Sequence, residues 1–368
     1  LTAPLLRLMQ TPSAYYDYAY WYLLIIFCGI GATVFYNIVA GLLRAVGDSR
    51  TPLYFLVAAA VLNVGLDFAF IMGCGWHYCG AALATVLSQL LSGGACLAYA
   101  LYRYPVLRPA RSDFGWDTRL AMGHFAVGLP MALQFSITAI GCIVQQTALN
   151  GLDAALPGAV TAYTAASKID NIANQVFVAL GTALATYAGQ NYGAGEFGRI
   201  RRGVLAGMVY VFAGSVIGFA FAVGLCEPLM KLFLNTDLSA DVAGNYGAII
   251  GYGRQFLLWQ CSFYPFLGAI YVYRNTLQGI GRSAVTTFAG VTELAGRVLA
   301  SLVFVRVWGF TGVCSSNPVA WVAAVIFLVA TYAVVMRRRN NGELPRARSR
   351  AHRRRLRRSC RIAVRRAS

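Results

Sequence analysis

The sequence predicts an all-α integral membrane protein, because both its composition and its apolar segments are typical of that class. Hydrophobic residues make up 58% of the chain and charged residues only 12%, which is about half the charged share of a soluble domain. Several unbroken apolar segments reach the roughly 20 residues that a helix needs to cross a bilayer. They do not have the alternating ten-residue pattern of an outer-membrane barrel, so helices are the expected spanning elements.

Nine such segments follow one another along the chain. Each is separated from the next by a connection that contains glycine, proline or charged residues. We therefore expect transmembrane helices near residues 17–44, 51–73, 80–102, 122–149, 159–188, 203–226, 244–273, 284–305 and 312–336.

Arginine residues gather in every second connection between these segments. The arginine-rich connections lie near residues 44–50, 103–119, 199–202 and 274–282, and the alternate connections hold only Lys231 and Arg306. Basic loops face the cytoplasm in membrane proteins, so the first set and the C-terminus are predicted to be cytoplasmic. Nine spans then place Leu1 outside, and we expect an odd number of further spans before it.

The net charge of +18 resides mostly in residues 337–368, which hold fourteen arginines and one acid, Glu343. Arginine-rich tails bind nucleic acid or anionic lipid in some proteins. This tail has no aromatic residue on which a single strand could stack. We interpret it as a cytoplasmic tail that reinforces the orientation, and we expect no nucleic-acid partner.

An internal repeat connects two distant parts of the chain. The segment LRAVGDSRTPLYFLVAAAVLNVGLD from Leu43 resembles LQGIGRSAVTTFAGVTELAGRVLAS from Leu277, with Gly47 matched to Gly281. Both copies begin on the predicted cytoplasmic side, so they have the same orientation, as in transporters whose halves are related by an axis along the membrane normal. With six spans per half, the second half is complete and the first half has three.

The repeat defines the expected domain organisation. A partial amino-terminal lobe occupies residues 1–102, and a cytoplasmic linker follows over 103–121. A carboxy-terminal lobe of six helices occupies 122–336 before the basic tail of 337–368. The chain is then nine helices of a transporter with twelve helices in two lobes, a parallel pseudo-twofold 6+6 arrangement.

Asp67 is the first candidate functional residue. It is the only charged residue in the apolar stretch 53–73, and a carboxylate at bilayer depth costs roughly 2.5–3.5 kcal/mol on insertion scales. Asn63 lies four residues earlier, on the same helix face. Carboxylate and amide oxygens suit a proton or Na⁺ rather than a transition metal. The alternative is that Asp67 only bonds neighbouring helices together.

Taken together, these segments resemble the multidrug and toxic compound extrusion (MATE) family of efflux transporters. The resemblance runs through six stretches in order: LLRAVGDSRTP (42–52), VLNVGLDFAFI (61–71), GAALATVLSQ (80–89), GLPMALQFSITAIG (128–141), YAGQNYGAGEFGRIRRG (187–203) and NTLQGIGRS (275–283). It covers the chain up to the tail, and it implies that three family helices precede this sequence. In several family members the first helix supplies an acid to the amino-terminal cation site.

The resemblance implies an antiporter with no cofactor beyond a coupling ion. Thr85 aligns with the hydroxyl of the family's cation site, so Asp67, Asn63 and Thr85 are the expected H⁺ or Na⁺ ligands. Glu293 is a second candidate for coupling, although a structural pair with Arg297, four residues later, is an equal alternative.

A second set of polar or amphipathic residues lies in apolar context and is predicted to line a substrate cavity. Aromatic and polar linings suit bulky organic cations. The set is Gln134, Gln145, Gln146, Asn171, Asn174, Gln175, Gln260, Tyr264 and Tyr271, and Lys168 and Asp170 could face the same cavity.

The expected function is therefore secondary active efflux of organic cations by H⁺ or Na⁺ antiport. We expect a monomer in contact with membrane lipid, in the plasma or inner membrane. A membrane enzyme is disfavoured because no P-loop, HExxH or GxSxG motif is present. Two alternatives remain: a lipid or polysaccharide-precursor exporter of the same superfamily, and a truncated remnant that inserts without transporting.

Overall fold

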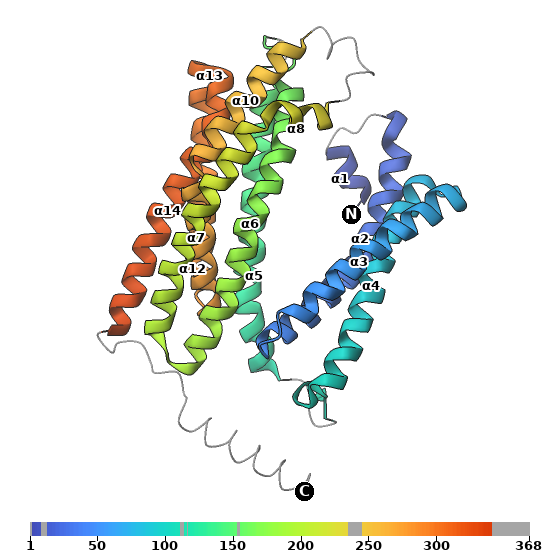
Figure 1. Cartoon of the computed structure of the whole chain (residues 1–368), viewed down its shortest axis with the longest axis vertical. Coiled ribbons are helices and arrows are strands. Elements are labelled where there is room, and N and C mark those ends of the chain that lie inside the picture. Colours follow the sequence, from blue (N-terminus) through green and yellow to red (C-terminus); the bar gives the residue numbers. More distant parts are fainter. Residues whose placement is uncertain are drawn as a thin grey trace, which may run out of the picture. The chain divides into compact units, whose positions relative to one another are not determined.

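The computed structural model describes residues 2–8, 13–110, 114–115, 117–152, 155–234 and 245–340. Every regular element in these ranges is a helix, and the chain divides into two compact units, Leu1–Trp116 and Asp117–Ser368 (Figure 1). The division falls inside the predicted linker 103–121. The part of the arginine-rich tail beyond residue 340 lies outside the described residues.

The first unit is built around one helix that two others cover. Its elements are α1 (Thr2–Leu8), α2 (Ser13–Ala45), α3 (Arg50–Asp67), the π-helix η1 (Phe68–Gly73), α4 (His77–Arg103) and the 3₁₀-helix η2 (Pro105–Leu107). Both α2 and α3 pack along α4. Val39 and Leu43 of α2 are buried with Cys96 and Ala100 of α4, and they form the core of this unit.

The second unit contains the larger core. Its elements are α5 (Thr118–Asn150), α6 (Ala159–Ala194), α7 (Phe197–Gly224), α8 (Cys226–Phe233), α10 (Tyr246–Ser262), α11 (Tyr264–Gly279), α12 (Ser283–Leu299), the π-helix η4 (Ala300–Phe304), α13 (Val305–Trp308) and α14 (Phe310–Asn340). Helix α12 packs against both α5 and α14, and α11 packs against α6. The long helices run side by side within this unit (Figure 1).

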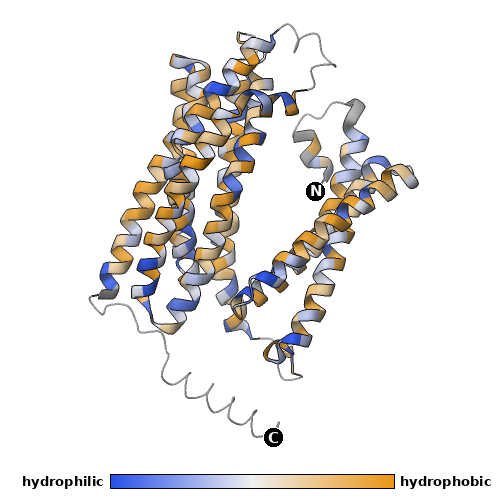
Figure 2. Cartoon of the chain, in the orientation of Figure 1, coloured by the Kyte–Doolittle hydropathy of each residue, from blue (hydrophilic) through white to orange (hydrophobic). Residues whose placement is uncertain are grey.

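The observed helices confirm the predicted membrane-spanning fold. Within the described residues, eight single helices are long and apolar enough to cross a bilayer, and a bent pair would make nine. Apolar residues occur along most of the length of these helices (Figure 2). The bent pair occupies the span expected near 244–273: α10 and α11 meet at an angle of 46°. Pro265 is in the first turn of α11, where its missing N–H is tolerated and where it interrupts a continuous helix.

The internal repeat is reproduced in the backbone of both units. Gly47 and Gly281 have left-handed φ values of +96° and +78°, and Gly75 and Gly309 have +67° and +55°; each pair is 234 residues apart. Each repeat helix ends in a π-helical segment, η1 after α3 and η4 after α12. A π-helical segment shifts the register of the residues that follow, and such segments are frequent at functional sites.

The glycine that opens the following helix also has the same surroundings in both units. A side chain on Gly80 would lie 2.9 Å from Cβ of Phe70, and one on Gly312 would lie 2.3 Å from the carbonyl carbon of Phe304. Phe70 and Phe304 are again 234 residues apart. The two units thus repeat the same helix–π-helix–turn–helix arrangement; the sequence predicted the repeat, and the structure adds its π-helical segments.

Asp48 ties together three parts of the first unit outside the membrane spans. Its Oδ1 accepts hydrogen bonds from the backbone N–H groups of Arg50 (3.2 Å) and Thr51 (3.0 Å) at the start of α3. Its Oδ2 accepts one from the hydroxyl of Tyr104, just beyond α4 (2.8 Å). Partial burial opposes the charged carboxylate, but the hydrogen bonds from Thr51, Tyr104 and Arg50 outweigh it and lower the Asp48 pKa.

Replacing Asp48 with alanine is expected to lower the stability of the first unit by about 1–2 kcal/mol, the cost of losing a helix cap. Because the folded pKa lies below the unfolded pKa, the stabilisation is present above the unfolded pKa of about 4 and is lost as pH falls through the folded pKa. Thermal unfolding of both proteins between pH 7 and pH 3 measures the difference. A gap that stays constant over this range would contradict the assignment.

Candidate functional site

A cavity of about 760 Å³ lies inside the second unit. Its wall comes from α5, α6, α11, α12 and α14, together with Phe256 of α10. Polar side chains dominate one part of the wall, and four of the residues are of charged types: Asp170, Arg274, Glu293 and Arg297. Aromatic rings complete it, with Phe135, Tyr163, Tyr271 and Trp321 among the lining residues. A space of this size can hold a drug-sized molecule.

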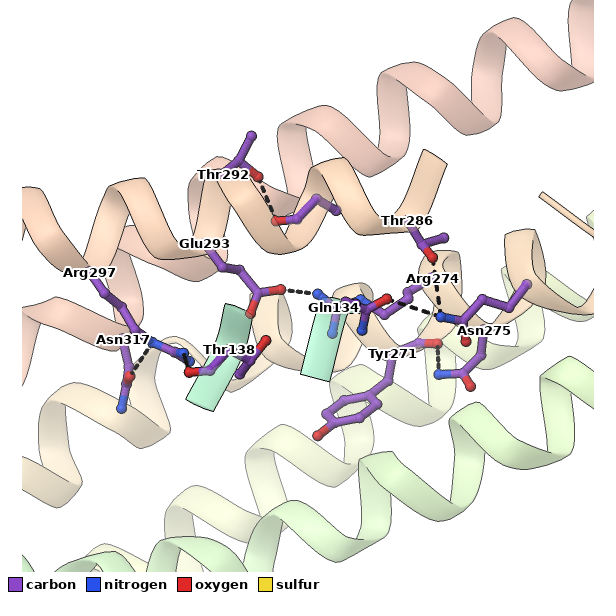
Figure 3. Close-up of polar contacts among 12 residues, drawn as sticks. Gln134, Thr138, Tyr271, Arg274, Asn275, Thr286, Thr292, Glu293, Arg297 and Asn317 are labelled. Carbon is purple, nitrogen blue, oxygen red and sulfur yellow. Dashed lines mark hydrogen bonds and ion pairs between the residues drawn. The ribbon is translucent and has the colours of Figure 1, made fainter. Parts of the chain in front are cut away.

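Glu293 and Arg274 form a buried ion pair across this cavity wall. The Arg274 guanidinium of α11 donates to Oε1 of Glu293 on α12, and Figure 3 shows the two side chains pointing toward each other. The side chains are 12% and 4% exposed. The Nε atom of Arg274 is buried without a partner in the described part of the chain. The predicted pair of Glu293 with Arg297 is therefore wrong, because Glu293 bonds a residue from the neighbouring helix.

Arg297 lies one helical turn beyond Glu293 and has only neutral partners. Its Nε donates to Oδ1 of Asn317 (3.1 Å), and its Nη1 donates to the backbone carbonyl of Thr138 (3.2 Å). Figure 3 shows the side chain directed toward these two residues. Among the described residues, no carboxylate lies within ion-pair distance of this guanidinium. Arg297 is 6% exposed, so α12 carries an isolated charge at membrane depth.

Asp170 supplies a carboxylate on the α6 side of the cavity. Its Oδ1 accepts a hydrogen bond from the hydroxyl of Tyr264 (2.9 Å). Tyr264 itself is fully buried and packs edge-on against Phe177. Lys168, two residues before Asp170, is exposed and lies over the ring of Phe233 at 5.4 Å. The helical spacing separates the two charges, so Asp170 lines the cavity and Lys168 does not.

The structure brings together five of the nine residues predicted for the substrate cavity. Those that line it are Gln134, Gln145, Asn171, Asn174 and Tyr271. The other four lie elsewhere: Gln146 bonds Asn150 on its own helix, Gln175 is exposed, Gln260 is buried with its Nε2 donating to the carbonyl of Cys314, and Tyr264 is buried behind Asp170.

The first unit contains the other candidate site, around Asp67 at the end of α3. Asp67 and Asn63 are half-buried, and Oδ1 of Asp67 and Nδ2 of Asn63 have no hydrogen-bond partner in the described part of the chain. Asp67 borders a hollow of about 350 Å³ that is otherwise lined by apolar side chains. A buried carboxylate oxygen without a partner is costly, so it fits a position that takes up a proton or a cation.

Thr85 does not join this pair through a hydrogen bond. Its hydroxyl donates to the carbonyl of Ala81 on its own helix (3.0 Å), and the residue is exposed. Among the described residues no hydrogen bond connects Thr85 with Asp67 or Asn63. The role of all three as cation ligands stays a prediction.

Arg274, Gln278 and Asn317 are cavity residues that the sequence reasoning did not single out. Gln278 donates to Oε1 of Gln134 (3.1 Å) and to the hydroxyl of Thr286 (3.2 Å). Arg274 was read as part of a cytoplasmic connection, although α11 extends to Gly279. A buried acid such as Glu293 requires a positively charged partner. That requirement is the signal that could have identified Arg274.

These features define a class: a multi-pass helical membrane protein with a repeated unit and a polar cavity within one lobe, as in secondary transporters. The MatE family description matches residues 1–69 and 130–300. The chain belongs to the MatE family, the multidrug and toxic compound extrusion transporters.

Individual relatives agree with this assignment. The chain is 31% identical over 290 residues to the probable multidrug resistance protein YpnP of Bacillus subtilis, covering 77% of this chain and 60% of YpnP. It is 25% identical to an FAD transporter of Shewanella oneidensis, covering 73% of this chain and 56% of that protein. The chain thus spans less than two thirds of the length of these two relatives.

Solved structures share the fold. A MOP-superfamily transporter from Pyrococcus furiosus superposes with a TM-score of 0.80 at 22% identity, covering 92% of this chain and 74% of that one. An outward-facing multidrug resistance transporter of the MATE family has a TM-score of 0.78, also at 22% identity, with coverage of 90% and 72%.

Proposed function

We propose that the protein acts in secondary active multidrug efflux, exporting organic cations in exchange for H⁺ or Na⁺. The observation that carries antiport is Asp67, a half-buried carboxylate whose Oδ1 has no hydrogen-bond partner among the described residues, as is also true of the amide nitrogen of its neighbour Asn63. Carboxylate and amide oxygens are ligands that suit a small, hard cation.

The cavity of the second unit supports the substrate class. Asp170 provides a carboxylate on the α6 side of it, Arg297 provides a guanidinium on the α12 side, and Tyr271, Phe135 and Trp321 provide ring faces. Organic cations bind aromatic faces and carboxylates together. The volume of about 760 Å³ is in the range of pockets that enclose drug-sized ligands.

Coupling follows from linkage between the two sites. If the cation favours one conformation and the substrate favours the other, each lowers the affinity for the other by the same factor. The Glu293–Arg274 pair belongs to the cavity wall, and a coupling role for Glu293 would require Arg274 to release it. We expect the protein to work as a monomer in the plasma or inner membrane with its C-terminus in the cytoplasm, as the arginine pattern predicts.

Dye uptake into liposomes tests this function. The purified chain is reconstituted, the lumen is made acidic or loaded with Na⁺, and uptake of the fluorescent cation ethidium is followed. We expect uptake to exceed that of protein-free liposomes several-fold under one of the two gradients, and to stop when an ionophore dissipates that gradient. Uptake equal to that of protein-free liposomes under both gradients would contradict the proposal.

A further inference from the structure

The repeat matches the residues of the two units position by position. With the spacing of 234 that joins Gly47 to Gly281 and Gly75 to Gly309, Asn63 corresponds to Arg297 and Asp67 corresponds to Ser301. Counted from Gly80 and Gly312, which have the same packing, Thr85 corresponds to Asn317. The candidate cation position of the first unit therefore has a counterpart in the second unit.

The counterpart position is occupied by the guanidinium of Arg297. Its contacts are neutral: Oδ1 of Asn317 lies 3.1 Å from Nε, and the carbonyl oxygen of Thr138 and Sγ of Cys142 lie 3.2 Å and 3.8 Å from Nη1. Gly141 leaves room for the side chain, because a Cβ there would lie 3.0 Å from Cδ of Arg297. Neutral oxygen acceptors around a buried positive charge are the ligand arrangement of a cation site.

The two positions are opposite in charge. The first unit has a carboxylate, Asp67, with an unpaired oxygen, and the described part of its α3–η1 segment beyond Arg50 has no basic residue. Among its described residues, the second unit has a cation, Arg297, with no carboxylate within ion-pair distance, and the neighbouring Glu293 is bonded by Arg274. At the position of Asp67 it has Ser301, whose buried hydroxyl has no hydrogen-bond partner in the described part of the chain.

We propose that Arg297 is a built-in cation. In the second unit its guanidinium occupies the position that corresponds to the one at which the first unit takes up an exchangeable cation. The protein's own guanidinium fills this position permanently, because arginine stays protonated in proteins. With this position filled and Glu293 held by Arg274, the position at Asp67 is left to exchange an ion, so the inference adds a limit of one coupled cation per cycle to the proposed function, on which that limit rests.

A free guanidinium compound tests whether the position is a cation site. Arg297→Ala removes the charge and leaves a space of matching shape, and we expect its thermal midpoint to fall by roughly 5 °C or more. Methylguanidinium at millimolar concentration is expected to restore part of that loss, whereas NaCl at the same concentration is not. The matched control is Arg306→Ala, which removes an exposed arginine six residues beyond the start of the π-helix η4. The thermal midpoint of this control should respond to methylguanidinium no more than that of the wild type.

Two substitutions whose side chains are similar in length to arginine keep the proposal testable if Arg297→Ala does not fold. Arg297→Lys retains the positive charge, and Arg297→Met retains only the apolar stem. We expect Arg297→Lys to be the more stable protein. A buried charge without a function is often replaced by an apolar residue at no cost, so Arg297→Met as stable as the wild type would overturn the proposal. Absence of a specific methylguanidinium effect in Arg297→Ala would overturn it as well.

These measurements need no transport, so they separate this inference from the proposed function. If methylguanidinium restores the stability of Arg297→Ala but ethidium uptake does not depend on a gradient, the built-in cation is supported and the proposed antiport is contradicted. If methylguanidinium has no effect but uptake is driven by a gradient, the antiport is supported and the built-in cation is contradicted. In the intact antiporter, more than one cation exchanged per ethidium would contradict the limit set by Arg297.

Discussion

Glu293→Gln is expected to lower the free energy of unfolding by about 3–5 kcal/mol, because it leaves the buried Arg274 guanidinium without its carboxylate. The glutamine oxygen can still accept a hydrogen bond, so the loss measures the missing charge rather than missing packing. Reversible unfolding of the purified protein in detergent gives the difference. Replacing both residues with methionine should recover most of it, since two apolar side chains leave no buried charge.

The exposed pair of Glu227 and Lys231 in α8 provides a matched control. Its nitrogen–oxygen distance is 2.9 Å, and its side chains are 58% and 55% exposed. Water screens this pair, so Glu227→Gln should cost far less stability than Glu293→Gln. If Glu293→Gln cost no more than Glu227→Gln, the buried pair would not hold α11 against α12.

Asp67→Asn is expected to abolish gradient-driven uptake of ethidium while leaving the amount of inserted protein unchanged. Asparagine has nearly the same shape as aspartate but cannot take up or release a proton, and its neutral oxygen binds Na⁺ far more weakly. The unpaired Oδ1 of Asp67 means that few native contacts are lost. The liposome assay, run with equal protein per vesicle, measures the change.

Asp17→Asn serves as the control for this substitution. Asp17 is an exposed residue of α2 in the same unit, so the control removes the same charge without touching the candidate site. Its uptake should equal that of the wild type. Uptake by Asp67→Asn at the wild-type rate would assign Asp67 a purely structural role.

The spans and the repeat could be predicted from the sequence because both depend on local patterns. A bilayer requires about 20 apolar residues per helix, so the length of each segment decided its assignment. The repeat was visible because the turns around Gly47 and Gly281 need a left-handed backbone, which favours glycine at both positions. The break into α10 and α11 could not be told from a kink within one helix, since Pro265 at a helix start looks the same in sequence as Pro265 within one kinked span.

The partners inside the cavity could not be predicted, because they depend on which helices become neighbours. Spacing along α12 suggested Glu293 with Arg297, but α11 presents Arg274 to Glu293 and α14 presents Asn317 to Arg297. The rotation of each helix about its own axis determines which of the other predicted residues face the cavity. Gln145 faces the cavity whereas Gln146, the next residue, bonds within its own helix, and an all-round apolar helix gives no signal for which face turns inward.

Ion release on substrate binding tests most directly the claim that Asp67 holds the ion exchanged for substrate. Ethidium is added to the purified protein in weakly buffered detergent solution, and released H⁺ or bound ²²Na⁺ is measured together with ethidium binding. The wild type is predicted to release one cation per ethidium bound, and Asp67→Asn to bind ethidium and release none. Equal release from both proteins would contradict the account.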